Sequence, residues 1–203
     1  MKLKLVKLNA FLFLILFVLF SCSKDPETII ETVEVVKEVE VTVTETVEVD
    51  PFADSTLEGV LTSDKTLSSD KIWLIKGRVV VGDGATLTIP AGTVIKAEPG
   101  SGADASTLII ARGGKIDAKG TASKPIIMTA KADNIQADGT YPATGASLTV
   151  NSRGLWGGLL VLGKAPSSFK GDVSELQIEG IPVSDTNGLY GGSVSEDNSG
   201  TMQ

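Results

Sequence analysis

From residue 56 onward, short runs of apolar residues alternate with turn-forming residues. Each run holds four to six residues, is rich in Val, Ile and Leu, and is bounded by Gly, Asp, Ser or Pro, a pattern typical of β-strands. The runs are IWLIKG (72–77), RVVV (78–81), TLTI (86–89), TVIKA (93–97), TLIIA (107–111), PIIMTA (125–130) and GLLVLG (158–163). Because no stretch of ten residues here shows helical periodicity, the pattern predicts an all-β fold over residues 56–203.

These runs recur at a fixed offset. When residues 78–92 are placed over residues 107–121, an offset of 29, the apolar run 79–81 falls on 108–110 and Leu87 falls on Ile116. Each unit then reads strand, Gly turn, strand, turn, strand. A repeat of about 30 residues with three short strands indicates one rung of a parallel β-helix.

The later runs extend this repeat. With a short insertion, 93–97 falls on 125–130, which aligns Val94 with Ile126. Residues 158–168 resemble the start of a third unit, after a polar insertion at 131–153. The sequence therefore predicts a β-helix solenoid, with a β-sandwich as the alternative fold.

The N-terminal residues 1–21 have the pattern of a secretory signal. Three lysines precede an apolar run of eleven residues (10–20), which is too short to cross a membrane. The run ends at Cys22, the only cysteine, and Leu19–Cys22 resembles a bacterial lipobox. We expect Cys22 to be lipidated and to anchor the protein to a membrane. The alternative is a free or disulfide-bonded thiol in a secreted protein.

Residues 22–55 are predicted to form an extended acidic stalk. Val occupies alternate positions between Glu and Thr over much of 33–49, and this period of two favours extended backbone. Between residues 23 and 55 there are ten acidic residues and two lysines. Because the remainder of the mature chain is close to neutral, no basic surface for nucleic acid is expected. Association of stalks through the Val positions remains an alternative.

The composition excludes several catalytic classes. The chain has no His, which removes Ser-His-Asp and Cys-His catalysis and imidazole zinc sites. A polysaccharide lyase would need a basic residue beside acidic calcium ligands. Arg78, Lys96, Arg112 and Arg153 are available, but no acidic residues lie in register beside them. No catalytic residues are assigned, and we expect a protein that is not an enzyme.

Two kinds of residue remain as binding candidates. SDTNG (184–188) and SEDNSG (195–200) carry oxygen-bearing side chains near Gly, the ingredients of a loop calcium site. The candidate ligands are Asp185, Asn187, Glu196, Asp197 and Asn198, although Asx turns explain the same residues. The aromatic candidates for stacking on a sugar ring are Tyr141, Trp156 and Tyr190, with core packing as the alternative for Trp156.

The motifs RGLWGGLLVLGKAP (153–166) and QIEGIP (177–182), together with the lipobox, closely resemble a family of Bacteroidota surface lipoproteins. The resemblance implies a right-handed parallel β-helix, an outer-membrane lipid anchor and exposure at the cell surface. It also implies that the chain corresponds to an N-terminal portion whose β-helix is incomplete at the C-terminus. The resemblance supplies no activity. We expect a binding or structural role toward a glycan or another envelope protein, with a polysaccharide lyase or hydrolase as the alternative.

Overall fold

The computed structural model describes residues 50–168, 170 and 173–203. The predicted signal, the lipidation at Cys22 and most of the predicted stalk lie outside these residues. The described part consists of short β-strands and two 3-10 turns. They are β1 (Thr56–Leu61), β2 (Lys65–Thr66), β3 (Ile72–Val81), β4 (Thr86–Ile89), β5 (Val94–Ala97), η1 (Gly102–Asp104), β6 (Thr107–Ile110), β7 (Lys115–Ala118), β8 (Ile127–Ala130), β9 (Leu159–Val161), β10 (Glu175–Gln177), η2 (Thr186–Gly188), β11 (Leu189–Gly191) and β12 (Gly200–Met202).

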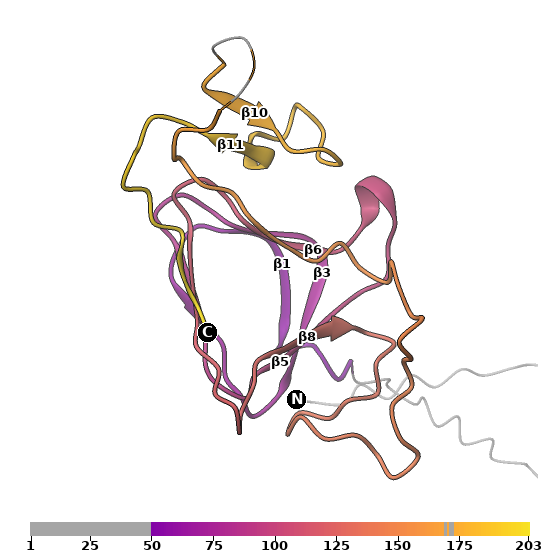
Figure 1. The fold of residues 1–203 in the computed structure, drawn as a ribbon. Helices are drawn as coiled ribbons and strands as arrows, with labels where there is room; N and C mark the ends of the chain where they lie inside the picture. The colour runs from indigo at the N-terminus through magenta and orange to yellow at the C-terminus, as the bar shows by residue number, and fades with distance from the viewer. Residues whose placement is uncertain (1–49, 169, 171–172) are drawn as a thin grey trace, which may run out of the picture. The chain divides into compact units, whose positions relative to one another are not determined.

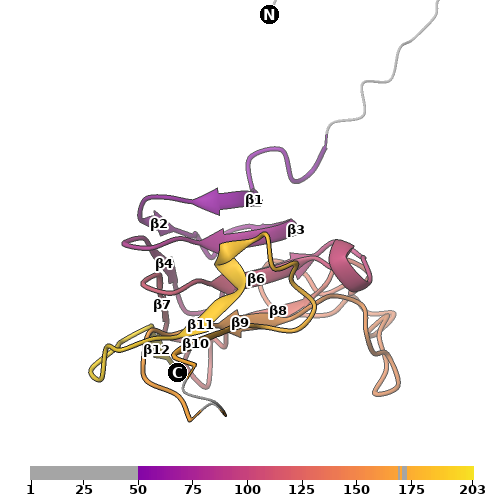
Figure 2. The ribbon, with the colours of Figure 1, turned by 90° about the horizontal axis from the view of Figure 1, so that it is seen from above.

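The strands form three parallel stacks that the chain visits in turn. The first stack contains the start of β3, then β5 and β8, and the second contains the end of β3, then β6 and β9. The third contains β2, β4, β7 and β12. Strand β1 covers both halves of β3. Figures 1 and 2 show the stacked strands from two directions at right angles to each other. This arrangement is a parallel β-helix and not the antiparallel pairing of a β-sandwich.

Two glycines bend the chain between the first two stacks. Strand β3 is continuous where the sequence suggested two separate runs, and it turns at Gly77, whose φ is 63°. Gly59 has a φ of 67° at the irregularity in the pairing of β1 with β3. This left-handed conformation suits a residue without Cβ. The bends at Gly59 and Gly77 let β1 and β3 each contribute to both the first and the second stack.

The core lies between the stacks and is built from alternate residues of each strand. Val79, Leu87, Leu108, Ile110 and Ile116 are at most 1% exposed and belong to one apolar cluster. Inward and outward positions alternate because successive side chains point to opposite faces of a strand. The predicted superpositions of 79–81 on 108–110 and of Leu87 on Ile116 are confirmed as register pairs.

The second stack is also covered on its outer face. The outward residues Val80 and Ile109 are buried against Leu162 and Ile181, which come from the long segment after β9. Within that segment β10 and β11 pair as a hairpin, which Figure 1 shows outside the stacks. Strands buried on both faces read as uninterrupted apolar runs. This explains the runs Val-Val-Val and Leu-Ile-Ile, whose covering segment the sequence did not reveal.

The structure corrects three details of the sequence interpretation. Val94 pairs with Ile127 and not with Ile126, so the predicted phase of the third strand was wrong by one residue. The insertion after β8 extends to residue 158 before β9 begins. Residues 200–202, which no predicted run includes, form strand β12, and this strand pairs with β7. At 125–130 the two consecutive Ile residues left the phase unspecified, whereas at 200–202 polar or mixed residues obscured the strand.

Candidate functional site

A polar groove lies where β3 bends and two loops approach it. Its volume is about 400 Å³, within the usual range for small-ligand sites. We call it the Arg78 groove. Its lining residues are Val60, Gly77, Arg78, Val80, Ala103, Asp104, Ala105, Asp185 and Asn187. Strands β1 and β3 form its floor, while the η1 loop and the η2 loop form its walls.

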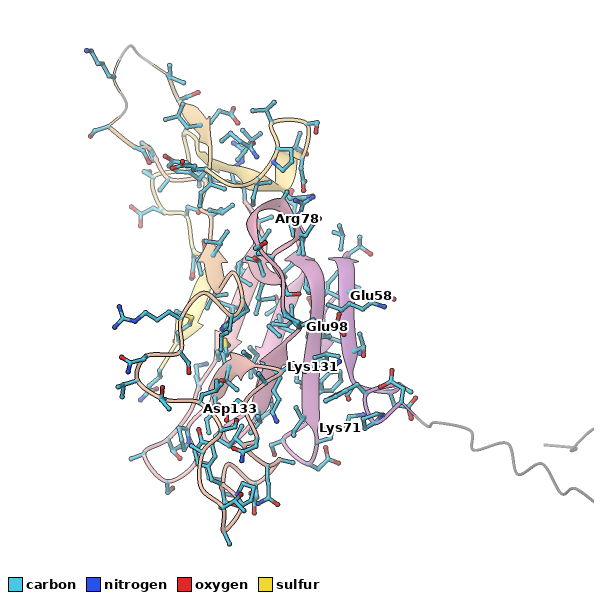
Figure 3. All side chains as sticks on the ribbon, turned by 90° about the vertical axis from the view of Figure 1, so that its right-hand side faces the viewer. Glu58, Lys71, Arg78, Glu98, Lys131 and Asp133 are labelled. Carbon is cyan, nitrogen blue, oxygen red and sulfur yellow. The ribbon has the colours of Figure 1, made fainter. Side chains whose placement is uncertain are left out.

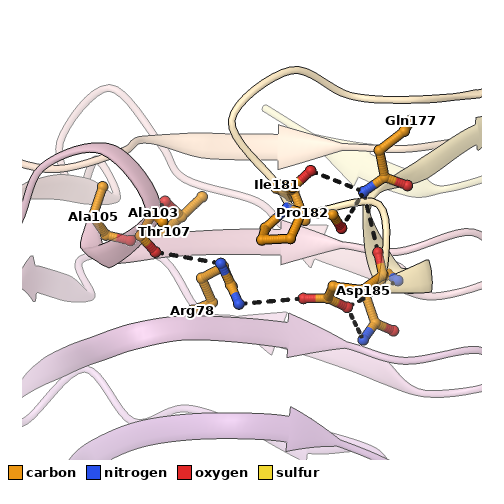
Figure 4. A network of polar contacts seen from close by, with 9 residues as sticks. Arg78, Ala103, Ala105, Thr107, Gln177, Ile181, Pro182 and Asp185 are labelled. Atoms are coloured by element: carbon orange, nitrogen blue, oxygen red, sulfur yellow. Dashed lines mark hydrogen bonds and ion pairs between the residues drawn. The ribbon is translucent and has the colours of Figure 1, made fainter.

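Arg78 connects the two walls. Its Nη1 donates a hydrogen bond to the carbonyl oxygen of Ala103 at 3.3 Å. Its Nη2 lies 3.6 Å from Oδ2 of Asp185, and both side chains are partly exposed. Figure 4 shows both contacts. Because the second distance is longer than a hydrogen bond, both groups keep capacity to bind another molecule.

Asp185 is fixed by the turn that it begins. Its Oδ1 accepts hydrogen bonds from the backbone nitrogen of Asn187 at 3.1 Å and from Nδ2 of Asn187 at 2.9 Å. This is the capping arrangement that favours Asp at the start of a helical turn. The Nε2 of Gln177 lies 3.1–3.3 Å from the carbonyl oxygens of Ile181, Pro182 and Asp185. The η2 loop is therefore held in a defined position beside Arg78 (Figure 4).

The five predicted calcium ligands do not come together. Asp185 and Asn187 line the Arg78 groove, where Asp185 pairs with the guanidinium of Arg78 and not with a candidate metal ligand from the second motif. Asp197 accepts a hydrogen bond from the backbone of Lys164 at 2.6 Å, and Asn198 accepts one from Gly200. Glu196 is exposed. Over the described residues, no group of three or more His, Cys, Asp or Glu side chains could hold a metal ion. The calcium hypothesis stays a prediction without an assembled site.

The three aromatic candidates lie in different surroundings. Trp156 packs against the main core cluster, as the core-packing alternative expects. Tyr141 is 44% exposed, and its hydroxyl lies 3.4 Å from Oδ2 of Asp133. Tyr190 packs against the smaller apolar cluster and lines a second groove of about 400 Å³ together with Val161 and Ile178. The three rings therefore have different neighbours.

The four basic residues considered for catalysis are also separated. Arg112 pairs with Glu175 at 2.5 Å and donates to the carbonyl oxygen of Gly191, which attaches the hairpin to the β-helix. Arg153 is exposed on the insertion after β8. Arg78 and Asp133 lie toward opposite ends of one side of the domain (Figure 3), so Lys96, which bonds to Asp133, does not belong to the Arg78 groove.

Lys96 belongs to a buried polar cluster beneath the insertion after β8. It is 7% exposed, and its Nζ donates to the carbonyl oxygen of Asp133 at 2.7 Å. Burial lowers the pKa of Lys96, and the charge of Asp133 partly opposes this. Desolvation, together with Asp133, raises the pKa of Tyr141. These shifts have the character found at active sites and equally in structural networks, and no described groove is lined by Lys96.

Charges elsewhere on this side largely neutralise one another. Lys76 lies 3.9 Å from Glu58, and Lys131 lies 3.2 Å from Glu98. Figure 3 shows Glu58, Glu98 and Lys131 along one side of the domain. A further groove of about 630 Å³ beside Met128, Leu159 and Met202 has no ionisable side chain in its lining. Another groove, of about 450 Å³, is lined by Asp50, Asp54 and Lys71 but by no amide side chain. The Arg78 groove is the candidate site because it combines a guanidinium, two carboxylates and an amide.

Sequence reasoning found only parts of this site. The sequence suggests Arg78 as a base and Asp185 and Asn187 as metal ligands, but no sequence feature links the three residues. Asp104 was not identified. The only local signal for the loop that carries it was the Gly- and Ser-rich stretch 100–106 between two apolar runs.

Comparison with known proteins gives a family and no individual relative. The model of a pectate-lyase-like β-helix domain matches residues 59–203. No curated protein and no solved structure matches the chain. The matched range includes the stacks, the insertions and the Arg78 groove. The chain therefore belongs to the family defined by the pectate-lyase-like β-helix domain.

Proposed function

We propose that this protein is a cell-envelope lipoprotein that binds a glycan in the Arg78 groove without cleaving it. In this proposal a lipid on Cys22 holds the chain at the outer membrane. The stalk carries a right-handed β-helix solenoid away from the membrane, facing the cell exterior. The observation that carries the binding role is the convergence of a guanidinium, two carboxylates and an amide in one groove.

The chemistry of these groups suits sugar hydroxyls. A hydroxyl both donates and accepts hydrogen bonds, so it can donate to Asp104 or Asp185 and accept from Arg78 or Asn187. Val60 is 51% exposed at the same groove and offers an apolar contact for the C–H groups of a sugar ring. A mixture of apolar surface and a few convergent polar groups is the usual composition of a ligand site.

Binding is favoured over cleavage because the groove lacks a group with a catalytic environment. Arg78 contacts Asp185 and a backbone carbonyl, and the chain contains no His. A polysaccharide lyase or hydrolase is retained as a second candidate, since the family description is pectate-lyase-like. The lowered pKa of Lys96, caused by burial, is the property that a lysine base would need.

The anchoring proposal rests on the sequence around Cys22. The basic N-terminus, the short apolar run and the residues before Cys22 support it. Among the described residues, no helix has the length and apolar character to span a bilayer. A lipid attached to Cys22 would provide attachment without a spanning helix.

The binding role is tested by a conservative change at Arg78. Purified full-length protein and its Arg78→Gln variant are compared on neutral oligosaccharides, with affinities measured by calorimetry. Since hydrogen bonds to charged groups contribute about 1.5–3 kcal/mol, we expect Arg78→Gln to weaken binding at least about tenfold. Arg153→Gln removes an exposed charge outside the groove and should leave affinity unchanged. Equal affinities for the wild type and Arg78→Gln would refute the site.

A further inference from the structure

We infer that the Arg78 groove selects saccharides that carry a free amino group and disfavours saccharides that carry carboxylates. This inference rests on the proposed glycan-binding function and names the substrate class of the same site. The starting point is the charge of the lining. Asp104 and Asp185 contribute two carboxylates, and Arg78 is the only basic residue that lines the groove.

The two carboxylates keep acceptor capacity toward a ligand. The Oδ1 of Asp185 is occupied by Asn187, whereas its Oδ2 has only the ion pair with Arg78 at 3.6 Å. Asp104 ends the η1 turn and is exposed. Among the described residues its carboxylate has no hydrogen bond or ion pair. An ammonium group has three donors and no acceptor, so it complements these oxygens.

A uronate carries a carboxylate, which the carboxylates of the lining would repel. Its carboxylate could bind Arg78 only beside Asp185, which already pairs with that guanidinium, and close to Asp104. Like charges placed together in a binding site lower affinity and act as discrimination against the wrong ligand. Asp104 is therefore the specificity-determining residue, because it is the carboxylate that no protein group neutralises.

The experiment measures the affinity of the full-length protein for three tetrasaccharide probes. They are glucosamine, N-acetylglucosamine and galacturonate tetrasaccharides at low ionic strength. We expect the glucosamine probe to bind most tightly, the N-acetylated probe less tightly and the galacturonate probe least. Added salt should weaken the glucosamine complex and reduce the difference between probes. Galacturonate binding as tightly as glucosamine would overturn the inference.

The Asp104→Asn variant isolates the contribution of the carboxylate. An exposed ion pair contributes up to about 1 kcal/mol, so the variant should lose about fivefold in affinity for the glucosamine probe. Its affinity for the N-acetylated probe should stay within about twofold. Glu196→Gln removes an exposed carboxylate that does not line the groove and serves as the matched control. An unchanged preference in Asp104→Asn would also overturn the inference.

The outcomes separate this inference from the function that it builds on. If the N-acetylated probe binds and Arg78→Gln weakens that binding, while the glucosamine probe binds no better, glycan binding stands and the amine selectivity is wrong. If none of the probes binds, or if binding of the N-acetylated probe is insensitive to Arg78→Gln, the proposed site is wrong and the inference fails with it.

Discussion

At the residue scale, the most unusual environment is that of the buried pair Lys96 and Asp133. They are 7% and 5% exposed. The carboxylate of Asp133 accepts hydrogen bonds from the hydroxyl of Thr129 at 2.8 Å and from the backbone nitrogen of Ile135 at 3.2 Å. Thus Asp133 retains partners of its own, whereas the one hydrogen bond described for the Lys96 ammonium is to the Asp133 carbonyl. The two residues should therefore respond differently to replacement.

We predict that Asp133→Ala lowers the free energy of unfolding by about 3 kcal/mol, because it leaves a buried ammonium without a compensating charge. Lys96→Met should cost less than about 1 kcal/mol, since its chain fills the space of the lysine stem. The double variant should be more stable than the sum of the single effects predicts. Urea unfolding of all four proteins measures this. Equal costs for the two single changes would contradict the interpretation.

At the scale of the element, β6 and the end of β3 in the second stack have two buried faces with different partners. Ile110 on β6 points into the main core, and Ile109 points outward against the segment after β9. Val161 pairs with Ile110 in the next strand, β9, yet is 44% exposed. At this paired position the side chain is therefore buried on β6 and exposed on β9, the next strand.

We predict that Ile110→Asp unfolds the domain, because an unpaired charge in this core costs several kcal/mol. Val161→Asp is the matched control in the same column and should change stability by about 0.5 kcal/mol or less, as exposed positions usually do. Thermal unfolding followed by circular dichroism distinguishes the two variants. A folded Ile110→Asp protein with an unchanged melting temperature would mean that this face of β6 is not in the core.

At the scale of the whole molecule, the proposed function separates attachment from recognition. The Arg78 groove lies in the described domain, whereas the predicted attachment point, Cys22, is outside it. If both proposals are right, either property can be removed without the other. Loss of the anchor should leave the groove and its affinity intact, because the groove is built entirely from residues of the β-helix domain.

We predict that Cys22→Ala moves the protein from the membrane fraction to the soluble fraction or stops its processing, since the acyl chains hold the mature protein on the bilayer. Fractionation of cells followed by immunodetection measures this. Cys22→Ser is the conservative comparison and should behave in the same way, because it also lacks a thiol. Unchanged membrane retention of both variants would refute the anchor. Protease treatment of intact cells tests the predicted surface exposure.

The sequence by itself determined the strand-forming runs, the absence of long helices over residues 56–203 and the 29-residue correspondence between two rungs. These features are local, because the alternation along a strand follows from its own geometry, and stacked rungs repeat the same apolar positions. The prediction of which residue of 125–130 pairs with Val94 was wrong by one position, because both Ile126 and Ile127 are apolar. Consecutive apolar residues do not specify which one points inward.

Only the tertiary structure decided where the insertions lie and what they cover. Asp104 and Asp185 come from loops without apolar periodicity, and they line one groove with Arg78 because η1 and the segment after β9 fold back over the second stack. Such contacts depend on backbone hydrogen bonds and packing between distant segments, as when Gln177 holds the η2 loop. Local sequence pattern carries no information about them, since turn residues favour bends without specifying the direction in which a loop returns.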